Sequence, residues 1–307
     1  MSMKKWFIFN IILLALPSLL WANVYKQPPS DQSLIGDVQY ITTQPNDKIF
    51  SIQQHFDVGY NAMKAANPHL DLLAPMLPNT TIVIPMQHLL PSEPRNGIVI
   101  NLPEMRIYYY LSETNDVLTY PVGIGKIGNM IPITKTVIKR KTENPSWIPT
   151  AQIREFNLKN GITLPTVMPA GPDNPLGPYA IYTGIPTYLM HSTIYPDSIG
   201  TRASFGCIRM YLSDIEELFQ EVSPGTPLSI IDMPVKIGFQ ENRLYMEAYP
   251  PLEEHRHGYG ASLPSIVYLI ENNTRKSPVL VDWQLVSFLN EERDGMPHEI
   301  GTKLLLQ

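Results

Sequence analysis

The sequence predicts a mainly β protein with short helices, in which a small βααβ unit precedes a larger β-rich domain and a C-terminal α+β extension. A chain of 307 residues exceeds one ordinary domain. Its 30 prolines, about twice the usual share, favour loops, edge strands and extended connectors over long helices. Short β-branched and aromatic runs recur between residues 97 and 122, whereas helical spacing of apolar residues is confined to short segments.

Residues 1–22 have the composition of a secretory signal peptide. A basic start is followed by an apolar run at residues 6–20, and cleavage is expected after Ala22. An uncleaved anchor is the less favoured alternative, because the run is shorter than the ~20 residues that a span needs and contains Asn10 and Pro17. We therefore expect an exported protein without a transmembrane span after cleavage.

Charge and cysteine content narrow the function further. The net charge is −5, and it becomes −7 without the signal segment, which holds two lysines and no acid, so nucleic acid is not expected as a partner. Exported proteins usually pair their cysteines, but Cys207 is the only cysteine in the sequence. A solitary exported thiol is either reactive or buried as a small hydrophobe, and the residues around Cys207 distinguish these two possibilities.

After a polar, proline-containing linker at residues 23–38, the segment 39–87 predicts a strand, two helices and a strand. Apolar residues recur at helical spacing after an Asn46-Asp47 cap, and the second helix ends before Pro68. This block resembles a LysM module, a resemblance carried by the helix Asp47–Phe56, the step Ala66-Asn67-Pro68 and the end Ile82-Val83-Ile84-Pro85. The resemblance implies binding of peptidoglycan through N-acetylglucosamine; a helper domain without a sugar site is the alternative.

Residues 96–233 are expected to form the β-rich domain, which three successive strands open as a meander at 97–102, 105–110 and 117–122. The next segment, Gly123–Gly128, spells G-x-G-x-x-G. We reject a dinucleotide site because the following residues predict a loop and a strand instead of a helix.

No long helix is expected between residues 135 and 170, and short strands then lead to His191. Beyond Met210, Ser213 and Glu216 suggest a capping box for a short amphipathic helix, followed by a closing strand at 228–231.

The C-terminal extension, residues 234–307, is expected to contain a strand at 244–249 and a helix that starts at Ser277-Pro278. Four apolar residues would share one face of this helix: Val281, Leu285, Phe288 and Leu289.

Neither a metal site nor a cofactor is expected. The spacings of His55, His69 and His88 match no metal motif, and we expect these histidines at the surface. We expect His255 and His257 in a solvated loop.

The chemistry concentrates between His191 and Met210. The imidazole of His191 precedes the Cys207 thiol by sixteen positions, and the pair could supply the base and the nucleophile for acyl transfer from an amide. A backbone carbonyl such as that of Ser192 could orient the imidazole, and Gly206 would let N–H groups approach an oxyanion. Arg209 could bind a substrate carboxylate or pair with an acid of the chain.

Residues 96–233 resemble the YkuD-type L,D-transpeptidases. The resemblance is carried by three motifs in order along the chain: Asn174-Pro175-Leu176-Gly177, His-Ser-Thr from His191, and Ser-x-Gly-Cys-Ile-Arg-Met from Ser204. Together with the LysM-like block and Asp294-Gly295-Met296-Pro297, these motifs are similar to those of the ErfK-like subgroup of the Gram-negative periplasm.

This resemblance implies that Cys207 attacks the diaminopimelate carbonyl of a tetrapeptide stem, releases D-alanine and forms a thioester. It implies that His191 is the base, oriented by the Ser192 carbonyl, and that Ser204, Phe205 and Arg209 adjoin the substrate. An amine would resolve the thioester, either from another stem or from an outer-membrane lipoprotein.

Phe205 departs from the common family motif Ser-His-Gly-Cys, which has histidine at this position. We expect a change in local polarity with activity retained, because the catalytic imidazole is the upstream one. Two alternatives are a non-catalytic peptidoglycan-binding protein, which only Phe205 favours, and a sortase-like thiol transpeptidase, whose histidine lies much further from its cysteine.

Overall fold

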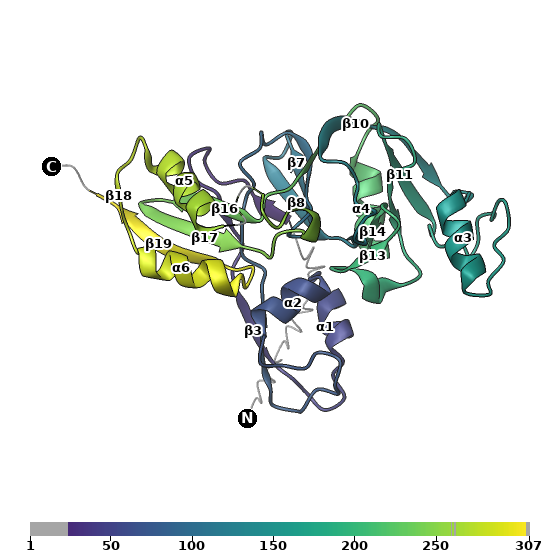
Figure 1. Ribbon diagram of the computed structural model, residues 1–307, viewed down its shortest axis with the longest axis horizontal. Coiled ribbons are helices and arrows are strands. Elements are labelled where there is room, and N and C mark those ends of the chain that lie inside the picture. The colour runs from purple at the N-terminus through teal and green to yellow at the C-terminus, as the bar shows by residue number, and fades with distance from the viewer. Residues whose placement is uncertain (1–23, 259, 261, 305–307) are drawn as a thin grey trace, which may run out of the picture.

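The computed structural model describes residues 24–258, 260 and 262–304. The expected signal peptide lies outside these residues. A large sheet occupies the centre, the C-terminal extension and helix α3 (Ala151–Lys159) lie at opposite ends of the long axis, and a helical unit projects from one side (Figure 1). Within the described residues, no helix has the length and apolar character that crossing a membrane requires.

The projecting unit has the expected order of strand, helix, helix and strand. Its antiparallel strands are β3 (Gln39–Thr42) and β4 (Thr81–Ile84), and its helices are α1 (Ile49–His55) and α2 (Tyr60–Ala66). The expected cap was wrong: Lys48 precedes α1, and the Asp47 carboxylate accepts from the Gln44 N–H at 2.7 Å, which stabilises the turn before the helix. The unit has its own apolar core: Ile52, Val58, Met63, Leu72, Ile82 and Ile84.

The segment expected to be only a linker takes part in the fold. Strand β1 (Val24–Lys26) pairs with β8 at the edge of the large sheet, and β2 (Leu34–Ile35) pairs with β5 (His88–Leu89). Its composition did not reveal these strands because both are very short and pair with residues far along the chain.

The large sheet has nine strands in the order β1-β8-β7-β6-β15-β10-β11-β12-β14. The expected meander is confirmed as β6 (Gly97–Asn101), β7 (Arg106–Leu111) and β8 (Asp116–Pro121). The expected closing strand, β15 (Pro227–Ile231), pairs in parallel with β6. The other strands are β10 (Thr134–Glu143), β11 (Tyr179–Thr183), β12 (Leu189–Ser192) and β14 (Ile208–Met210).

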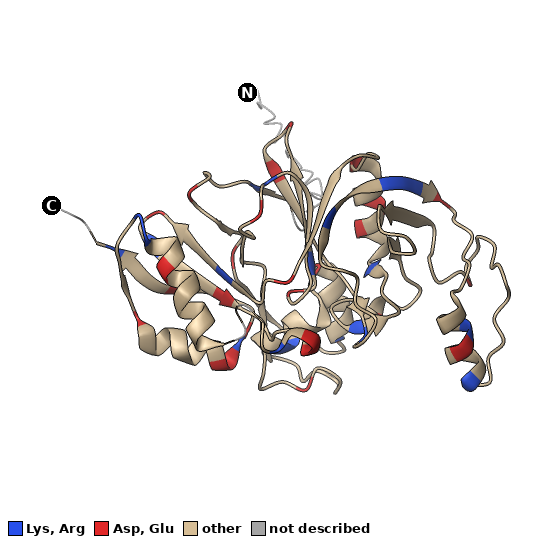
Figure 2. Cartoon of the chain, turned by 45° about the horizontal axis from the view of Figure 1, so that its top comes forward, with Lys and Arg blue, Asp and Glu red and all other residues tan. Residues whose placement is uncertain are grey.

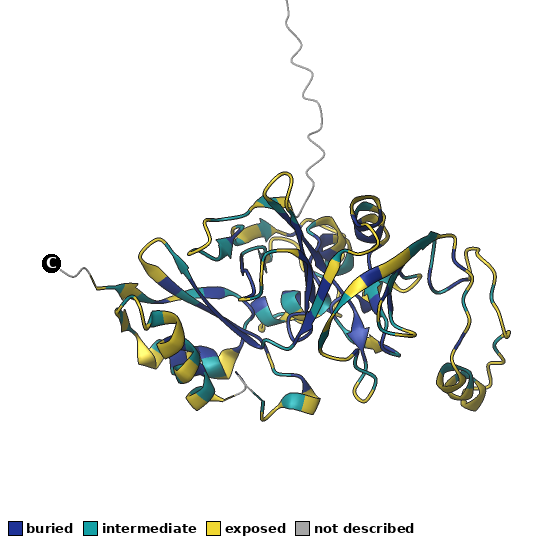
Figure 3. Cartoon of the chain, turned by 90° about the horizontal axis from the view of Figure 1, so that it is seen from above, coloured by how far each residue is buried: buried dark blue, intermediate teal, exposed yellow. Residues whose placement is uncertain are grey.

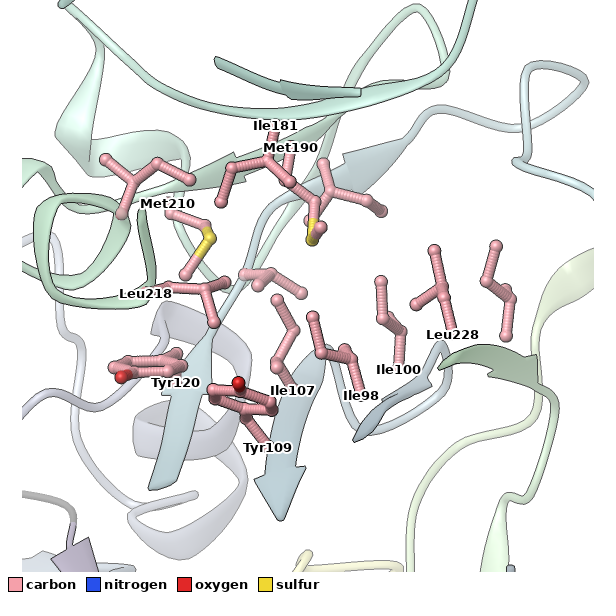
Figure 4. Close-up of a cluster of buried hydrophobic side chains, with 14 of the residues drawn as sticks. Ile98, Ile100, Ile107, Tyr109, Tyr120, Ile181, Met190, Met210, Leu218 and Leu228 are labelled. Carbon is pink, nitrogen blue, oxygen red and sulfur yellow. The ribbon is translucent and has the colours of Figure 1, made fainter. Parts of the chain in front are cut away.

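The sheet curls around helix α4 (Leu212–Glu221), because strands from both ends of the sheet order share one core with it. Figure 4 shows Ile98 and Ile107 of the meander on one side of this core, with Met190 and Met210 on the other. Burial is concentrated in these central strands (Figure 3). The core therefore fixes β12 and β14 next to each other.

One helix expectation in this domain fails, and one short helix was not foreseen. Residues 151–159 form α3 (Ala151–Lys159), which the sequence did not reveal because the helix buries none of its residues; Thr150 caps it by accepting from the Ile153 N–H at 3.3 Å. The capping box of α4 is absent, because the helix starts two residues earlier than expected, with Tyr211 as its N-cap in place of Ser213. Ser213 instead donates to Asp214 at 2.9 Å.

The glycine-rich turn contains no helix. It carries strand β9 (Ile124–Gly125), which pairs in parallel with β13 (Arg202–Ser204). A Cβ atom at Gly125 would lie 2.0 Å from the Asn129 carbonyl oxygen. The glycine therefore allows close packing of two backbone segments.

The C-terminal extension is a four-stranded sheet in the order β16-β17-β19-β18, packed against two helices. Its strands are β16 (Val235–Gln240), β17 (Arg243–Ala248), β18 (Val279–Val281) and β19 (Pro297–Lys303). Its helices are α5 (Leu263–Thr274), which the sequence did not reveal, and α6 (Trp283–Glu292). The short 3₁₀ turns are η1 (Pro196–Ser198) and η2 (Glu253–His255).

The expected start of the last helix was wrong. Residues 279–281 pair with β19, and the helix starts only after Asp282, whose carboxylate accepts from the N–H groups of Gln284 at 3.1 Å and Leu285 at 3.0 Å. This cap satisfies two N–H groups, whereas Pro278 offers no such acceptor.

Candidate active site

Cys207 lies in a tight turn between β13 and β14. The buried Ser204 hydroxyl holds this turn by donating to the Cys207 carbonyl at 2.6 Å and accepting from the Gly206 N–H at 3.0 Å. Ser204, which the sequence assigned to substrate binding, therefore directs its hydroxyl into the turn.

Gly206 is required by the geometry of this turn. Its φ of 116° is outside the range of ordinary L residues, and a Cβ atom there would lie 2.7 Å from Cε1 of Tyr188 and 3.1 Å from the Asn129 carbonyl oxygen. The turn thus packs directly on an aromatic ring, with no room for a side chain.

His191 comes from β12, which pairs in parallel with β14, so that Met190 lies opposite Ile208 and His191 opposite Arg209. This register places the imidazole on the strand next to β14, which the Cys207 turn directly precedes. Nδ1 of His191 is hydrogen-bonded to the Ser192 carbonyl oxygen. Because that carbonyl can only accept, Nδ1 carries the proton and Nε2 is the basic nitrogen of the neutral ring.

The backbone of Ser192 is fixed in turn by the segment Asn174–Gly177. The Ser192 hydroxyl donates to the Leu176 carbonyl at 3.0 Å, and a Cβ atom at Gly177 would lie 2.1 Å from that hydroxyl oxygen. Asn174 is buried, and its amide donates to the carbonyls of Pro145 at 2.8 Å and Pro169 at 3.1 Å. This bracing by Asn174 was not foreseen from the sequence, although the residue stands in the quoted motif.

Burial keeps the resting pair neutral. Desolvation lowers the pKa of the His191 imidazole to about 4, the Arg209 charge acts in the same direction, and the carbonyls of Ser192 and Pro175 oppose them. Desolvation raises the pKa of the Cys207 thiol, against the Leu189 N–H and the Arg209 charge, which lower it. The site therefore rests as thiol and imidazole, in contrast to a preformed thiolate–imidazolium pair.

A strained residue adjoins the thiol. Thr187 has a φ of 72°, unusual for a β-branched residue, and its carbonyl accepts from the Cys207 thiol at 3.7 Å. The sequence contained no signal for this conformation, because Thr187 is disfavoured at positive φ and only the fold imposes it.

Arg209 and Phe205 flank Cys207. The Arg209 guanidinium lies 5.9 Å from the centre of the Tyr195 ring, and the charge of Asp197 acts on it. The Phe205 ring meets Phe156 of α3 edge to face, with 5.2 Å between the ring centres. The ammonium of Lys126 lies over both rings, a neighbour that sequence reasoning missed.

One histidine expectation was wrong. His88 is buried together with Glu104 and Glu247, whose carboxylates and the imidazole could in principle hold a metal ion. The chain already supplies a cation there, however, because the Lys236 ammonium lies 2.9 Å from Glu104 and 3.0 Å from Glu247. The Arg106 guanidinium adds a second positive charge at 3.8 Å from Glu104. This cluster balances its own charge and leaves no vacancy for a divalent cation.

The curled sheet, with an imidazole on β12 and a thiol in the turn that leads into the adjacent β14, has the layout of a cysteine acyltransferase. Residues 95–237 match the family model of YkuD, the L,D-transpeptidase catalytic domain. Together with the full-length relatives described next, this match places the chain in the YkuD/ErfK family of cysteine L,D-transpeptidases.

Three curated relatives span nearly the whole chain. "Probable L,D-transpeptidase YcfS" of Escherichia coli is 37% identical, with 97% of this chain and 95% of the relative covered. "Probable L,D-transpeptidase ErfK/SrfK" of Salmonella typhimurium is 38% identical, with 96% of each chain covered. "Probable L,D-transpeptidase YbiS" of Escherichia coli is 35% identical, with 97% of this chain and 98% of the relative covered.

Proposed function

We propose that this enzyme is an L,D-transpeptidase that acts on the peptide stems of peptidoglycan in the periplasm. The observation that carries the proposal is the neutral imidazole of His191, held by the Ser192 carbonyl on the strand next to the Cys207 turn. A nucleophile, a base and an acceptor that orients the base are the parts that thiol acyl transfer needs.

The proposed reaction begins when His191 takes the thiol proton and the Cys207 sulfur attacks the diaminopimelate carbonyl of a tetrapeptide stem. The bond to D-alanine then breaks, its nitrogen receives the proton from His191, and a thioester remains on Cys207. An amine attacks the thioester, forms a new amide, and returns a proton to the thiol through His191. The overall exchange conserves protons and requires no cofactor.

Because the resting thiol is protonated, deprotonation coincides with attack instead of preceding it. Gly206 supports the step by allowing the turn whose N–H groups can stabilise the oxyanion, worth about 3 kcal/mol per donor. Arg209 and Phe205 lie beside the thiol as candidate substrate contacts, and Ser204 contributes by holding the turn.

The test is acylation of residues 23–307, the chain without its expected signal segment, by a disaccharide-tetrapeptide. We expect a mass increase equal to the stem less one alanine on wild-type protein, and none on Cys207→Ala. A sorting-signal peptide serves as the control donor. Absence of the adduct on folded wild-type protein, or turnover that survives in Cys207→Ala, would contradict the proposal.

The acceptor amine is either the diaminopimelate side chain of a second stem or a lysine of an outer-membrane lipoprotein. These two acceptors give products of different mass from the same thioester. A competition with equal concentrations of both amines therefore measures the preference directly.

We also propose that residues 39–87 act as a LysM-type peptidoglycan-binding unit. The support is the strand-helix-helix-strand order with its two strands paired. The Cys207→Ala protein should sediment with purified cell-wall sacculi, and soluble N-acetylglucosamine oligomers should release it. Sedimentation that the oligomers leave unchanged would argue for a helper domain without a sugar site.

A further inference from the structure

Lys126 is held beside the Cys207 turn by the backbone. It follows β9 directly, and its N–H donates to the Ser204 carbonyl at 3.0 Å. A Cβ atom at the preceding Gly125 would lie 3.2 Å from the Gly206 Cα, so the two turns are in contact. The position of Lys126 relative to the thiol is therefore set by the main chain and does not depend on a flexible loop.

Two aromatic rings hold the Lys126 ammonium. Nζ lies 3.7 Å from the centre of the Phe205 ring and 4.3 Å from that of Phe156. The faces of aromatic rings attract a cation without neutralising its charge. Within the chain segments that the structure describes, no carboxylate forms an ion pair with this ammonium, so its charge is available to a ligand.

Arg209, the other cation at the site, is in a different situation. It lies opposite His191 across the strand pair, and Asp197 and the Cys207 thiol already act on its charge. The Arg209 charge also lowers the pKa of the Cys207 thiol and that of the His191 imidazole. Lys126 is therefore suited to the substrate, and Arg209 contributes to the electrostatics of the reacting groups.

We propose that Lys126 binds a carboxylate of the donor stem close to the amide that Cys207 attacks, and that Phe205 and Phe156 position its ammonium for this contact. The inference rests on the proposed function and adds a specificity-determining residue to it. The donor stem offers two such carboxylates, one on the departing D-alanine and one on the diaminopimelate side chain.

This role also gives Phe205 a function. A histidine at that position would repel the Lys126 ammonium whenever it became protonated, whereas phenylalanine presents the same attractive face at every pH. The departure from the common motif thus creates a cation-binding ring next to the nucleophile. It also ties helix α3 to the site, because Phe156 supplies the second ring.

The experiment compares three donor stems on the full chain: the free acid, the stem with amidated D-alanine, and the stem with amidated diaminopimelate side-chain carboxylate. We expect Lys126→Gln to lower kcat/KM for the free acid roughly tenfold, ~1.4 kcal/mol, mainly through KM. The loss should shrink to less than about twofold on the amidated stem that lacks the bound carboxylate, which identifies the carboxylate. Lys126→Arg should restore most of the activity.

Lys139→Gln is the matched control, since Lys139 is an exposed lysine of β10, and this variant should behave as wild type on all stems. An equal loss for Lys126→Gln on all three stems would indicate a structural role and overturn the proposal, as would no loss on any stem. Failure of the proposed function is distinct from both, because wild-type protein would then process none of the stems.

Discussion

At the scale of single residues, burial governs the protonation of the proposed catalytic pair, His191 and Cys207. The imidazole of His191 is deprived of solvent and faces the Arg209 charge, so its neutral form is favoured, and the same desolvation favours the protonated thiol of Cys207. The enzyme thus keeps its nucleophile unreactive toward solvent electrophiles until a substrate is in place.

This arrangement leads us to expect a specific pH dependence. A general base must be neutral to accept a proton. Because the pKa of His191 is lowered to about 4, kcat/KM should fall on the acid side with a midpoint near pH 4 instead of near pH 6.5. In the absence of substrate, iodoacetamide should alkylate Cys207 at neutral pH more slowly than it alkylates a cysteine peptide. An acid limb between about 6 and 7 would contradict this account.

Gly206→Ala tests the geometry of the turn. The added methyl group would meet the Tyr188 ring at 2.7 Å while φ is 116°, so we expect the turn to shift and kcat to fall by roughly a hundredfold. Gly225→Ala is the control, because Gly225 has a φ of 93° with nothing within 4 Å of the added atom. This control should keep its activity and lose only about 1 kcal/mol of stability. Equal activity in both variants would count against a strict requirement at Gly206.

At the scale of elements, the projecting unit of residues 39–87 contacts the segment between His191 and Cys207. The N–H groups of Tyr60 and Asn61, at the start of α2, donate to the carbonyls of Ile199 at 3.0 Å and Gly200 at 3.1 Å. A Cβ atom at Gly59 would lie 2.7 Å from the Gly200 Cα. The unit is therefore in backbone contact with the chain that connects His191 to Cys207.

The same junction buries two acidic side chains, Asp57 after α1 and Asp214 in α4. Burial raises the pKa of the Asp214 carboxyl well above its ordinary value, and the charge of Asp57 and a hydrogen bond with it act in the same direction, with Glu217 contributing further. Ser213 donates to Asp214 and opposes the shift. The folded protein therefore retains a proton that the unfolded chain releases.

Stability should consequently fall as pH rises. Because Asp214 binds its proton more tightly in the folded state, its contribution is fully present below its unfolded pKa of about 4 and is lost as pH rises through the raised folded value. Asp214→Asn should flatten this dependence and raise the unfolding free energy at neutral pH. Denaturant titrations between about pH 4 and 8 measure the effect.

Glu216→Gln provides the control on the exposed side of the same helix, where the pH dependence should persist. A steep pH dependence that remains in Asp214→Asn would show that another group carries it.

At the scale of the whole molecule, a buried charge cluster joins the catalytic domain to the C-terminal extension. Glu104 follows β6 of the large sheet, whereas Lys236 and Glu247 belong to β16 and β17 of the extension. The phenolic hydroxyls of Tyr108 and Tyr249 donate to the carboxylates. The extension is therefore attached by a buried network whose positive and negative charges no longer compensate each other if one charged residue is removed.

Lys236→Met should cost ~3–5 kcal/mol of unfolding free energy, because it removes the ammonium that pairs with two buried carboxylates and leaves only Arg106 beside Glu104. Adding Glu247→Gln should recover part of this loss. Arg243→Gln is the matched control: Arg243 also pairs with a glutamate at 2.9 Å, but that pair is largely exposed, so its loss should cost less than about 1 kcal/mol. Equal costs in Lys236→Met and Arg243→Gln would contradict a structural role for the buried cluster.

Outside this cluster, positively and negatively charged residues are mixed along the chain instead of gathering in one place. Figure 2 shows Lys and Arg interspersed with Asp and Glu along the chain, including on α3. The electrostatic features that matter for function are therefore local: the cations beside Cys207 and the balanced cluster at the junction.

The sequence by itself determined the elements with strong local signals. The aromatic and β-branched runs of the meander, the two helices before Pro68 and the order of His191, Gly206 and Cys207 depend on nearby residues only, so their patterns could be interpreted without a structure. Helix α3 was missed because it buries none of its residues, so it has no sustained apolar face in the sequence. Helix α5 was overlooked although Leu263, Ile266 and Ile270 recur at helical spacing after Ser262. The starts of α4 and α6 were misplaced because more than one nearby residue could serve as the N-cap.

Tertiary structure decided what depends on partners distant in sequence. Only the tertiary fold places the Lys126 ammonium over Phe205 and Phe156 and buries His88 in a charge cluster, and the positive φ of Thr187 is likewise visible only in the structure. Desolvation follows from the packed surroundings, so the neutral state of His191 and Cys207 could not be deduced from their spacing. The sequence supplied the reacting groups, and long-range packing set their protonation, their strain and their neighbours.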